Sequence, residues 1–506
     1  MRLFIFGIGG TGSRVLKSLI MLSAAGVKPV DADGRPLKNF EIVPIIIDPH
    51  KSNEDLKRTE QMLTEYCVVR EKLYGRNVNG DGFFANKIST LREIMGMTSS
   101  SINDTFVFNM EAVGQSKFRQ FIGYDTMNEP NQALTSLLFA DYQLENKMNI
   151  GFVGSPNIGS VALNMIKDSE EFKAFANVFN EGDRIFFISS IFGGTGAAGF
   201  PILVKNIRQA ENLEVSNKNF LRNAPIGGLT VLPYFYLNNS QGKSIDKADF
   251  VVKTQSALQY YNETLTGEQD RNVNAIFYVG DQTASIPYDY DPGNVKDQHD
   301  PAHLVEFVSA MAPLKFAGMD DSQIYDATGG FQPTKAFEYG LEKDLLDVDF
   351  KTFGLETRHL IYKPMVKFHM LFIYLRTAFK DIIGQGYTQD SPKIKSEFTG
   401  TQFYRTLTGQ FFDHYTEWLT EMYGNMRHVQ LFNVGENNLG NIIHNVITRK
   451  GFFGHKTVDA NTFNSELNKL SRDNKKYSDR TVEYKLLDLF NEAAGNILEE
   501  KYENIN

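Results

Sequence analysis

The chain has 506 residues, enough for a large hydrophobic core and for two or three packed units. With 42% hydrophobic and 22% charged residues, its composition is that of a globular protein and excludes a largely disordered chain. The formal net charge of −9 argues against a protein that coats nucleic acid, so no nucleic-acid partner is expected. The single cysteine, Cys67, excludes an intramolecular disulfide and a zinc site built from clustered cysteines.

Nothing in the sequence predicts a membrane protein. No stretch approaches the ~18 consecutive apolar residues of a membrane-spanning helix. A strand-like run follows Met1 directly, so no signal peptide is expected. Because a single cysteine also suits a reducing compartment, we expect a cytoplasmic protein.

The first half of the chain alternates between apolar strands and helices. Residues 2–6 are expected to form a buried strand, 14–25 a helix with one apolar face, and 41–47 a second strand. This order is a βαβ unit, which implies a parallel sheet. Pro44 is unusual there, because proline has no N–H to donate to the ladder. Four further strands are expected at 148–153 (MNIGFV), 184–189 (RIFFIS), 227–237 and 274–280.

The second half of the chain has a different character. From about residue 301 the pattern predicts amphipathic helices, and no strand is expected among them. We therefore predict a nucleotide-binding domain over 1–300, with 51–147 as a helical insertion. A central helix and a mainly helical region would follow over 301–506. The fold class is α/β, with a Rossmann-like parallel sheet.

Two turns of the sequence GGTG stand between a strand and a helix, at residues 9–12 and 193–196. Glycine allows the backbone to approach a phosphate closely, and the following helix points its free N–H groups at the anion. One such turn also occurs as a tight connection without a ligand. Two of them, with the right elements between, are expected to form two walls of one phosphate site.

Residues 7–12 (GIGGTG) also match the dinucleotide fingerprint G-x-G-x-x-G. That fingerprint expects an acidic residue about 20 positions on, at the end of the second strand. Asp31 and Asp33 have that spacing but precede the strand, whereas Asp48 ends the strand but lies too far along. The fingerprint leaves the later glycine-rich turn unexplained. A P-loop is excluded because no G-x-x-x-x-G-K-[ST] occurs.

Residues 192–198 (FGGTGAA) resemble the signature GGGTG[ST]G of the tubulin/FtsZ superfamily, with Pro201 where FtsZ proteins also have proline. Further pieces follow in the family's order: residues 7–13 resemble the first nucleotide loop, 45–50 (IIIDPH) the second strand with its Asp, 154–160 (GSPNIGS) the third phosphate loop, and 228–236 the strand after the signature helix. The resemblance covers 1–50 and 148–281, and is closer to divergent bacterial tubulin-like proteins than to a standard FtsZ.

The resemblance implies a set of nucleotide-binding residues. These are Gly7, Gly9, Gly10, Thr11 and Gly12 in the first loop, Gly154, Asn157 and Gly159 near the γ-phosphate, and Gly193, Gly194, Thr195 and Gly196 around the phosphates. Asp48 would lie beside the site and reach the nucleotide through a hydrated Mg²⁺. GTP or GDP is the implied ligand, and Mg²⁺ the implied ion.

The chain also departs from the family's pattern. Phe192 and Ala198 replace the first and last glycines of the signature, which crowds the turn. Family members hydrolyse GTP with acidic residues of a neighbouring subunit, from a loop after a long central helix. Asp300, His303 and Glu306 (in DPAHLVEF) are weakly similar to that loop. The segment is expected instead to begin the central helix, with Glu306 on a solvated face; a catalytic Glu306 is the alternative.

Three functions are therefore open. The first is a tubulin/FtsZ-like GTP-binding protein, a GTPase that assembles with itself head to tail into filaments or rings. The second is a nucleotide-gated scaffold, of a stress or defence type, whose helical C-terminal region binds a protein partner and which hydrolyses little. The third is a Rossmann-type oxidoreductase, favoured by the N-terminal fingerprint alone.

Overall fold

The computed structural model describes residues 1–51, 53–76, 80–96, 102–110, 113, 116–152, 154–235, 247–267, 271–281, 300–379, 384–433, 435–451, 454–472 and 474–505. In these ranges no helix is both long and apolar enough to cross a membrane. Residues 282–299, which precede the expected domain boundary at residue 300, lie outside the described residues.

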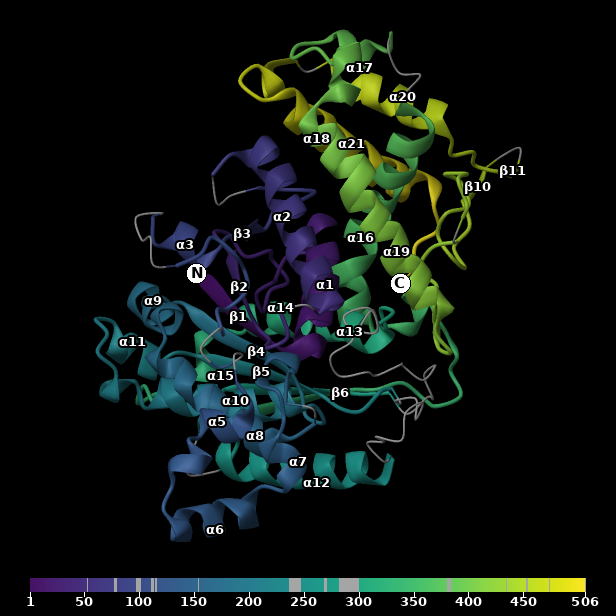
Figure 1. Cartoon of the computed structure of the whole chain (residues 1–506). Coiled ribbons are helices and arrows are strands. Elements are labelled where there is room, and N and C mark those ends of the chain that lie inside the picture. The colour runs from purple at the N-terminus through teal and green to yellow at the C-terminus, as the bar shows by residue number, and fades with distance from the viewer. Residues whose placement is uncertain are drawn as a thin grey trace.

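A seven-stranded parallel sheet forms the centre of the molecule, with the order β3-β2-β1-β4-β5-β6-β7 (Figure 1). Its strands are β1 (Arg2–Ile8), β2 (Glu41–Ile47), β3 (Lys87–Ile88), β4 (Arg184–Ser190), β5 (Ile226–Val231), β6 (Ala275–Val279) and β7 (Lys335–Tyr339). β2 and β4 lie on either side of β1 and pair with it in parallel. The strand order therefore reverses at β1 and β4, and in such sheets ligands bind beyond the carboxyl ends of the strands at that point.

Helices cover both faces of the sheet, which explains why its central strands are apolar throughout. Two neighbouring glycines of β5 mark the two faces. A Cβ on Gly227 would meet Phe316 of α14 (Ala312–Ala317), whereas one on Gly228 would meet Phe200 of α10 (Gly194–Arg208). The other helices of this half are α1 (Gly9–Ala24), α2 (Glu54–Tyr74), α3 (Leu91–Ile94), α5 (Phe118–Phe121), α6 (Glu129–Leu138), α7 (Asp141–Leu144), α8 (Pro156–Asn164), α9 (Glu170–Val178), α11 (Lys218–Arg222), α12 (Lys247–Thr264) and α13 (Leu304–Ser309).

Pro44 stands in the middle of β2 without loss of a hydrogen bond. On the side of β2 that faces away from β1, the Ile42 carbonyl accepts a hydrogen bond from the Ser89 N–H. On the same side, the Ile46 N–H donates to the Phe106 carbonyl, and the Ile46 carbonyl accepts from the Phe108 N–H. Because β3 is only two residues long, Pro44 faces the gap between these two partners. The missing N–H therefore has no acceptor to lose.

The C-terminal half is mainly helical and packs on the first two helices of the sheet layer (Figure 1). Its helices are α15 (Asp321–Ile324), α16 (Leu355–Thr377), α17 (Gly386–Gln389), α18 (Gln402–Thr406), α19 (Phe412–Gly424), α20 (Ala460–Leu470) and α21 (Val482–Lys501). The pairs β8 (Asp347–Val348) with β9 (His428–Val429), and β10 (Lys450–Gly451) with β11 (Gly454–His455), form two small sheets. Trp418 of α19 donates to the Ser18 hydroxyl of α1 at 3.2 Å, so the two halves share a buried contact.

Four expectations about elements need correction. The strand expected at 148–153 is wrong: Met148–Ile150 is a 3₁₀ turn, and Gly151, with φ of +83°, breaks the extended chain. The expectation of no strand after residue 301 is also wrong, because β7 completes the sheet beside β6. Residues 301–317, where a central helix was expected to begin, form two short helices instead, α13 and α14. The predicted insertion contributes α2 and β3 to the layered fold itself.

Candidate nucleotide site

The two GGTG turns meet at the carboxyl ends of β1 and β4. Gly9, at φ of +72°, turns the chain from β1 into α1. A Cβ placed on Gly9 would lie 3.6 Å from Thr195 Cβ and 3.9 Å from the Gly196 nitrogen. The turns are thus in contact, at the position where the reversed strand order predicts a ligand.

The third loop lies against the second of these turns. A Cβ on Gly194 would lie 3.1 Å from the backbone nitrogens of both Gly154 and Ser155. Gly154 itself has φ of +67°, a conformation that suits glycine. The beginnings of α1, α8 and α10 therefore converge on one place, and each offers backbone N–H groups that have no partner within its own helix.

Four of the expected residues form the open side of this place. Gly10, Gly154, Gly193 and Thr195 are partly exposed, whereas Gly7, Gly9, Thr11, Gly12, Gly159, Gly194 and Gly196 are buried. The accessible wall thus has one or two positions from each of the three loops. A phosphate chain laid there would contact all three.

Several of the buried glycines serve close packing. A Cβ on Gly12 would lie 2.4 Å from the Gly7 carbonyl carbon, so α1 presses directly on β1. A Cβ on Gly159 would lie 2.8 Å from Ala198 Cβ, at the crossing of α8 with α10. Gly196 would meet the Ser190 backbone at 2.8 Å. These glycines shape the loops without facing the opening.

Phe192 and Ala198, which depart from the family's signature, are both accommodated. The Phe192 ring packs edge-on against Phe235, with centroids 5.4 Å apart. Ala198 is 2% exposed and fills the space beside Gly159. Neither side chain closes the opening between the loops.

Asn157 begins α8 but is tied to the segment before the third loop. Its Oδ1 accepts from the backbone N–H of Ile158 at 3.0 Å and from Gln143 Nε2 at 3.3 Å. Gln143 Nε2 also contacts the Ser155 hydroxyl at 3.2 Å. The third loop is therefore held by α7, an element that the sequence did not place there.

Asp48 ends β2 and is 5% exposed. Its Oδ1 accepts the backbone N–H of His50 at 2.9 Å. Burial raises the pKa of Asp48 to about 7, with a smaller contribution from the nearby Asp55 and against the hydrogen bond from His50. A cation bound beside this carboxyl would favour its ionised form. Among the described residues, no group of three or more His, Cys, Asp or Glu side chains could hold a metal ion.

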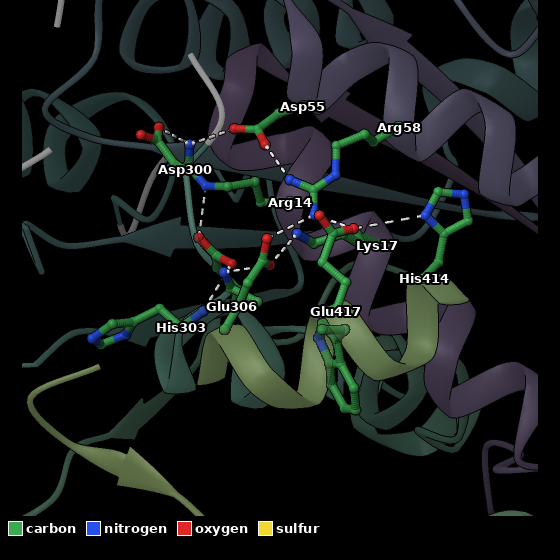
Figure 2. A network of polar contacts seen from close by, with 12 residues as sticks. Arg14, Lys17, Asp55, Arg58, Asp300, His303, Glu306, His414 and Glu417 are labelled. Carbon is green, nitrogen blue, oxygen red and sulfur yellow. Dashed lines mark hydrogen bonds and ion pairs between the residues drawn. The ribbon is translucent and has the colours of Figure 1, made fainter. Parts of the chain in front are cut away.

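Arg14 lies on the second turn of α1, beside the first loop. It is the centre of a buried ion cluster (Figure 2). Its Nη1 lies 3.8 Å from the position that a Cβ on Gly10 would take. Arg14 contacts three carboxylates, at 2.6 Å to Glu306, 2.7 Å to Asp300 and 3.2 Å to Asp55. The sequence did not predict this cluster, whose members lie up to 292 positions apart.

Glu306 is completely buried, so its expected position on a solvated face is wrong. Its Oε1 accepts from Arg14 Nε and from the Tyr234 hydroxyl, each at 2.6 Å. Its Oε2 accepts from the backbone N–H of His303 at 3.2 Å, which caps α13. Glu306 is thus a structural anion of its own chain, and a neighbouring subunit has no access to it.

Asp300 is the more accessible carboxylate of the cluster, with 19% of its side chain exposed. Burial raises its pKa to about 7, against the opposing effect of Arg14. His303 is 2% exposed, and burial lowers its pKa to about 4, so it is neutral at pH 7. The cluster continues to α19, where Glu421 binds Lys17 at 3.1 Å and Arg58 at 2.8 Å.

One cation reaches the loops from α12. Lys253 Nζ lies 3.4 Å from the Gly154 carbonyl oxygen, and the side chain is exposed. Lys253 could not be predicted from the sequence, because α12 follows the signature helix by some forty residues and only the folded chain brings Lys253 to the third loop.

Comparison with known proteins gives structural neighbours only. No protein-family model matches the chain, and neither does any curated protein. One solved structure that resembles it is CetZ from Methanosaeta thermophila strain DSM 6194, at 12% identity and a TM-score of 0.24, over 62% of this chain and 52% of the other. A second is a GTPγS-bound protofilament of CetZ2 from Haloferax volcanii, at 12% identity and a TM-score of 0.28, over 65% of this chain and 61% of the other.

Both are tubulin/FtsZ-like proteins. The observed α/β fold, a parallel sheet between helices, is the expected fold class. This chain spans about half to three fifths of the length of those proteins. At TM-scores this low, the likeness gives no guidance on ligands or activity, for which the contacts within the chain are the evidence.

Proposed function

We propose that the chain is a tubulin/FtsZ-like protein that binds GTP or GDP with Mg²⁺ at the three glycine-rich loops. One observation carries this proposal. The two GGTG turns contact each other, and the second of them also contacts the third loop, at the point where the strand order reverses. Backbone N–H groups of three helix N-termini would receive the phosphates. Asp48 would hold the ion and Lys253 would offset the charge of the terminal phosphate.

Self-assembly is the second part of the proposal. The partly exposed wall of Gly10, Gly154, Gly193 and Thr195 leaves one side of the nucleotide open to a neighbouring molecule. A head-to-tail contact across that side would be heterologous and would give filaments or rings. Binding would act as a switch, because a γ-phosphate adds contacts to the third loop that its release removes. We place this activity in the cytoplasm.

Hydrolysis is expected to be slow, as in a nucleotide-gated scaffold. Glu306 is sealed inside its own chain by Arg14 and Tyr234, so it is not a carboxylate that one molecule presents to another. This observation favours a binding module that holds its nucleotide for long periods. Its helical C-terminal region would then be the surface for a protein partner.

A thermal-shift titration with GTP, GDP, ATP and NAD, each with and without Mg²⁺, tests the nucleotide site. A ligand at 100 times its dissociation constant adds about 2.7 kcal/mol of stability. We expect GTP and GDP to raise the unfolding temperature, and Mg²⁺ to increase the effect. A shift with NAD alone would establish the oxidoreductase alternative, and no shift with any nucleotide would refute the site.

Phosphate release from GTP, measured over a range of protein concentrations, tests the slow hydrolysis. We expect a low turnover per molecule that does not rise with concentration. A turnover that increases steeply as molecules associate would show that a neighbour completes the active site, and would favour the GTPase over the scaffold.

A further inference from the structure

Residues 117–147, here called the arm, leave the body of the molecule and return to the same point. Lys117 and Lys147 form an antiparallel bridge at its base, and the Phe118 N–H donates to the Asn146 carbonyl at 2.9 Å. The Phe118 ring packs on Phe139 with centroids 4.9 Å apart. Figure 1 shows α6 at the lower edge of the molecule, beyond the helices of the sheet layer.

Helix α6 in the arm has its amphipathic pattern reversed. Its polar side chains face a 3₁₀ turn of the arm itself, Tyr124–Thr126: Gln132 donates to the Tyr124 carbonyl at 3.1 Å, and Ser136 contacts the Tyr124 hydroxyl at 2.9 Å. No residue of α6 is buried. The large apolar side chains point outward instead, with Leu134 56%, Leu137 85%, Leu138 62% and Tyr142 of α7 75% exposed. Spacings of three and four residues place Leu134, Leu137 and Leu138 in a stripe on one side of α6, as in helices that dock into a groove, and Tyr142 follows on α7.

The exposed area of this stripe is that of an interface. The exposed fractions of these four residues add up to almost three fully exposed residues. At ~150 Å² each, this is an exposed area on the order of 450 Å². Single-chain proteins rarely leave larger patches open, and a standard interface buries about 800 Å² on each partner. The arm therefore supplies roughly half of one side of a stable contact.

The charges around the stripe decide what it fits. The arm contains four acidic residues, and its Lys and Arg residues all lie at its base, outside 120–146. Arg119 pairs with Asp125, and Lys117 and Arg119 pair with Glu145; the other two acidic residues are Glu129 and Asp141. Helices that lie on membranes carry Lys or Arg on their polar face, so an anionic lipid surface does not match the arm.

The chain has a basic segment elsewhere: residues 437–458, which include the hairpin β10–β11, contain Arg449, Lys450 and Lys456 and no acidic residue. Lys456 pairs with Glu500 of α21 at 3.7 Å, so Lys450 is the cation that we assign to the contact. Ile447, 52% exposed, adds an apolar side chain beside the hairpin.

We propose that the arm of one molecule docks on the β10–β11 hairpin surface of a second copy of this chain. The leucine stripe would cover Ile447, while Asp141 and Glu129 would face Lys450. The two surfaces differ and lie far apart on the molecule (Figure 1), so the contact is heterologous and adds molecules one after another. This inference rests on the proposed self-assembly and specifies its contact.

The base of the arm is bonded to the proposed nucleotide site. Gln143 Nε2 contacts Ser155 at 3.2 Å and Asn157 at 3.3 Å, both in or next to the third loop. Asn146 Nδ2 donates to the Gly151 carbonyl at 3.2 Å. A change of the third loop on nucleotide binding would therefore reach the arm directly.

The test compares the association of the wild-type chain with that of the double variant Leu137→Ser, Leu138→Ser by sedimentation velocity, with GTP and Mg²⁺ present. We expect at least tenfold weaker association of the double variant. Because both side chains are exposed, its unfolding temperature and its thermal shift with GTP should equal those of the wild type. Phe220→Ser, which changes an apolar side chain of α11 that is 44% exposed, is the matched control and should associate normally.

Mixing two variants identifies the acceptor surface. Lys450→Glu keeps the arm and alters the hairpin, whereas the leucine variant does the opposite. Each alone should remain monomeric, and an equimolar mixture should form dimers that do not grow further. Normal association of the leucine variant, or a wild-type chain that stays monomeric, would overturn the proposal. A mixture without dimers would overturn the hairpin as acceptor. The thermal shift with GTP shows separately whether nucleotide binding stands.

Discussion

Gly10 and Gly12 are two positions apart in the first loop, yet a methyl group would meet different surroundings at each. At Gly10 the nearest atoms would be Asn53 Nδ2 at 3.7 Å and Arg14 Nη1 at 3.8 Å, which are ordinary contacts. At Gly12 the nearest atom would be the Gly7 carbonyl carbon at 2.4 Å. The same substitution therefore separates ligand binding from folding.

We expect Gly10→Ala to fold normally and Gly12→Ala to lose about 3 kcal/mol or more of stability, because backbone cannot move aside as a side chain does. Alanine in a helix adds up to ~1 kcal/mol, so Gly10→Ala should unfold no earlier than the wild type. Its Cβ would stand on the open wall of the site, and GTP binding should weaken at least tenfold. Chemical unfolding and nucleotide titration measure the two effects. Unchanged GTP affinity in Gly10→Ala would remove the first loop from the site.

Asp48 makes the stability of the ligand-free protein depend on pH. Burial raises its pKa from 3.8 to about 7, so the folded state holds a proton that the unfolded state releases. Below pH ~4 the carboxyl therefore does not lower the free energy of unfolding. Its destabilising effect grows as the pH rises to ~7. The full effect is up to about 4 kcal/mol.

Asp48→Asn removes this effect. We expect the variant to be as stable as the wild type near pH 4 and more stable at pH 7.5, with the difference developing between those values. Thermal unfolding of the two proteins in parallel over pH 4–8 measures it, and the other titrating groups cancel in the comparison. With GTP and Mg²⁺ the order should reverse at pH 7.5, because the variant lacks the carboxylate that would hold the ion. A constant difference over the whole range would contradict the raised pKa.

At the scale of elements, helix α1 links the phosphate loop to the C-terminal half. It begins with the first loop, places Arg14 among three carboxylates, and contacts α19 through Ser18. Arg14→Met would leave Asp55, Asp300 and Glu306 without their shared cation. Breaking a buried ion cluster in this way costs about 3–5 kcal/mol.

We expect Arg14→Met to lose stability by that amount at pH 7.5 and by less at pH 5. Burial already raises the pKa of Asp300 to about 7, and loss of the guanidinium would raise it further, so at pH 5 the carboxyl is protonated and needs no cation. Urea unfolding at the two pH values measures the difference. Arg35→Met, at a side chain that is 77% exposed, is the control and should change little at either pH.

The elements also show what the sequence could predict. Strands β1, β2, β4, β5 and β6 were predictable because each is a continuous apolar run in a sheet covered on both faces. Strand β7 was not, since it lies at the edge with alternate side chains exposed and is flanked by polar turns. Residues 148–153 have the composition of a strand, but β4 already occupies the place beside β1. A local run of apolar residues identifies a buried strand. It does not show which segments pair with a neighbouring strand in the sheet.

The residues of the candidate site also fall into those that the sequence could predict and those that it could not. The three loops were predictable because glycine at a strand–helix turn is a local requirement of the backbone. Arg14 with Glu306, and Lys253 with Gly154, are pairs far apart in the chain, and only the completed sheet brings them together. An arginine two residues after the first glycine-rich turn was the one available signal. Its partners could not be deduced from spacing.

At the scale of the whole molecule, the two halves share one continuous core. Phe84, which follows α2, packs on Phe368 of α16 at 5.9 Å and on Phe411 at 5.2 Å between ring centroids. Together with the Arg14 cluster, these contacts join the predicted domains 1–300 and 301–506 through apolar and ionic groups. A shared core of this kind predicts that neither half unfolds alone.

Trp418 reports on this contact, because it is the only tryptophan and lies between α19 and α1. We expect its fluorescence and the far-UV circular dichroism to change at the same urea concentration, since loss of the contact exposes both halves of the core. GTP with Mg²⁺ should move the two transitions together, although the loops that would bind it belong to the first half. A Trp418 transition that came first and ignored GTP would show that the C-terminal half detaches independently. The ion cluster would then be a surface of contact between domains, and the nucleotide would have no route through α1 to the helices that follow.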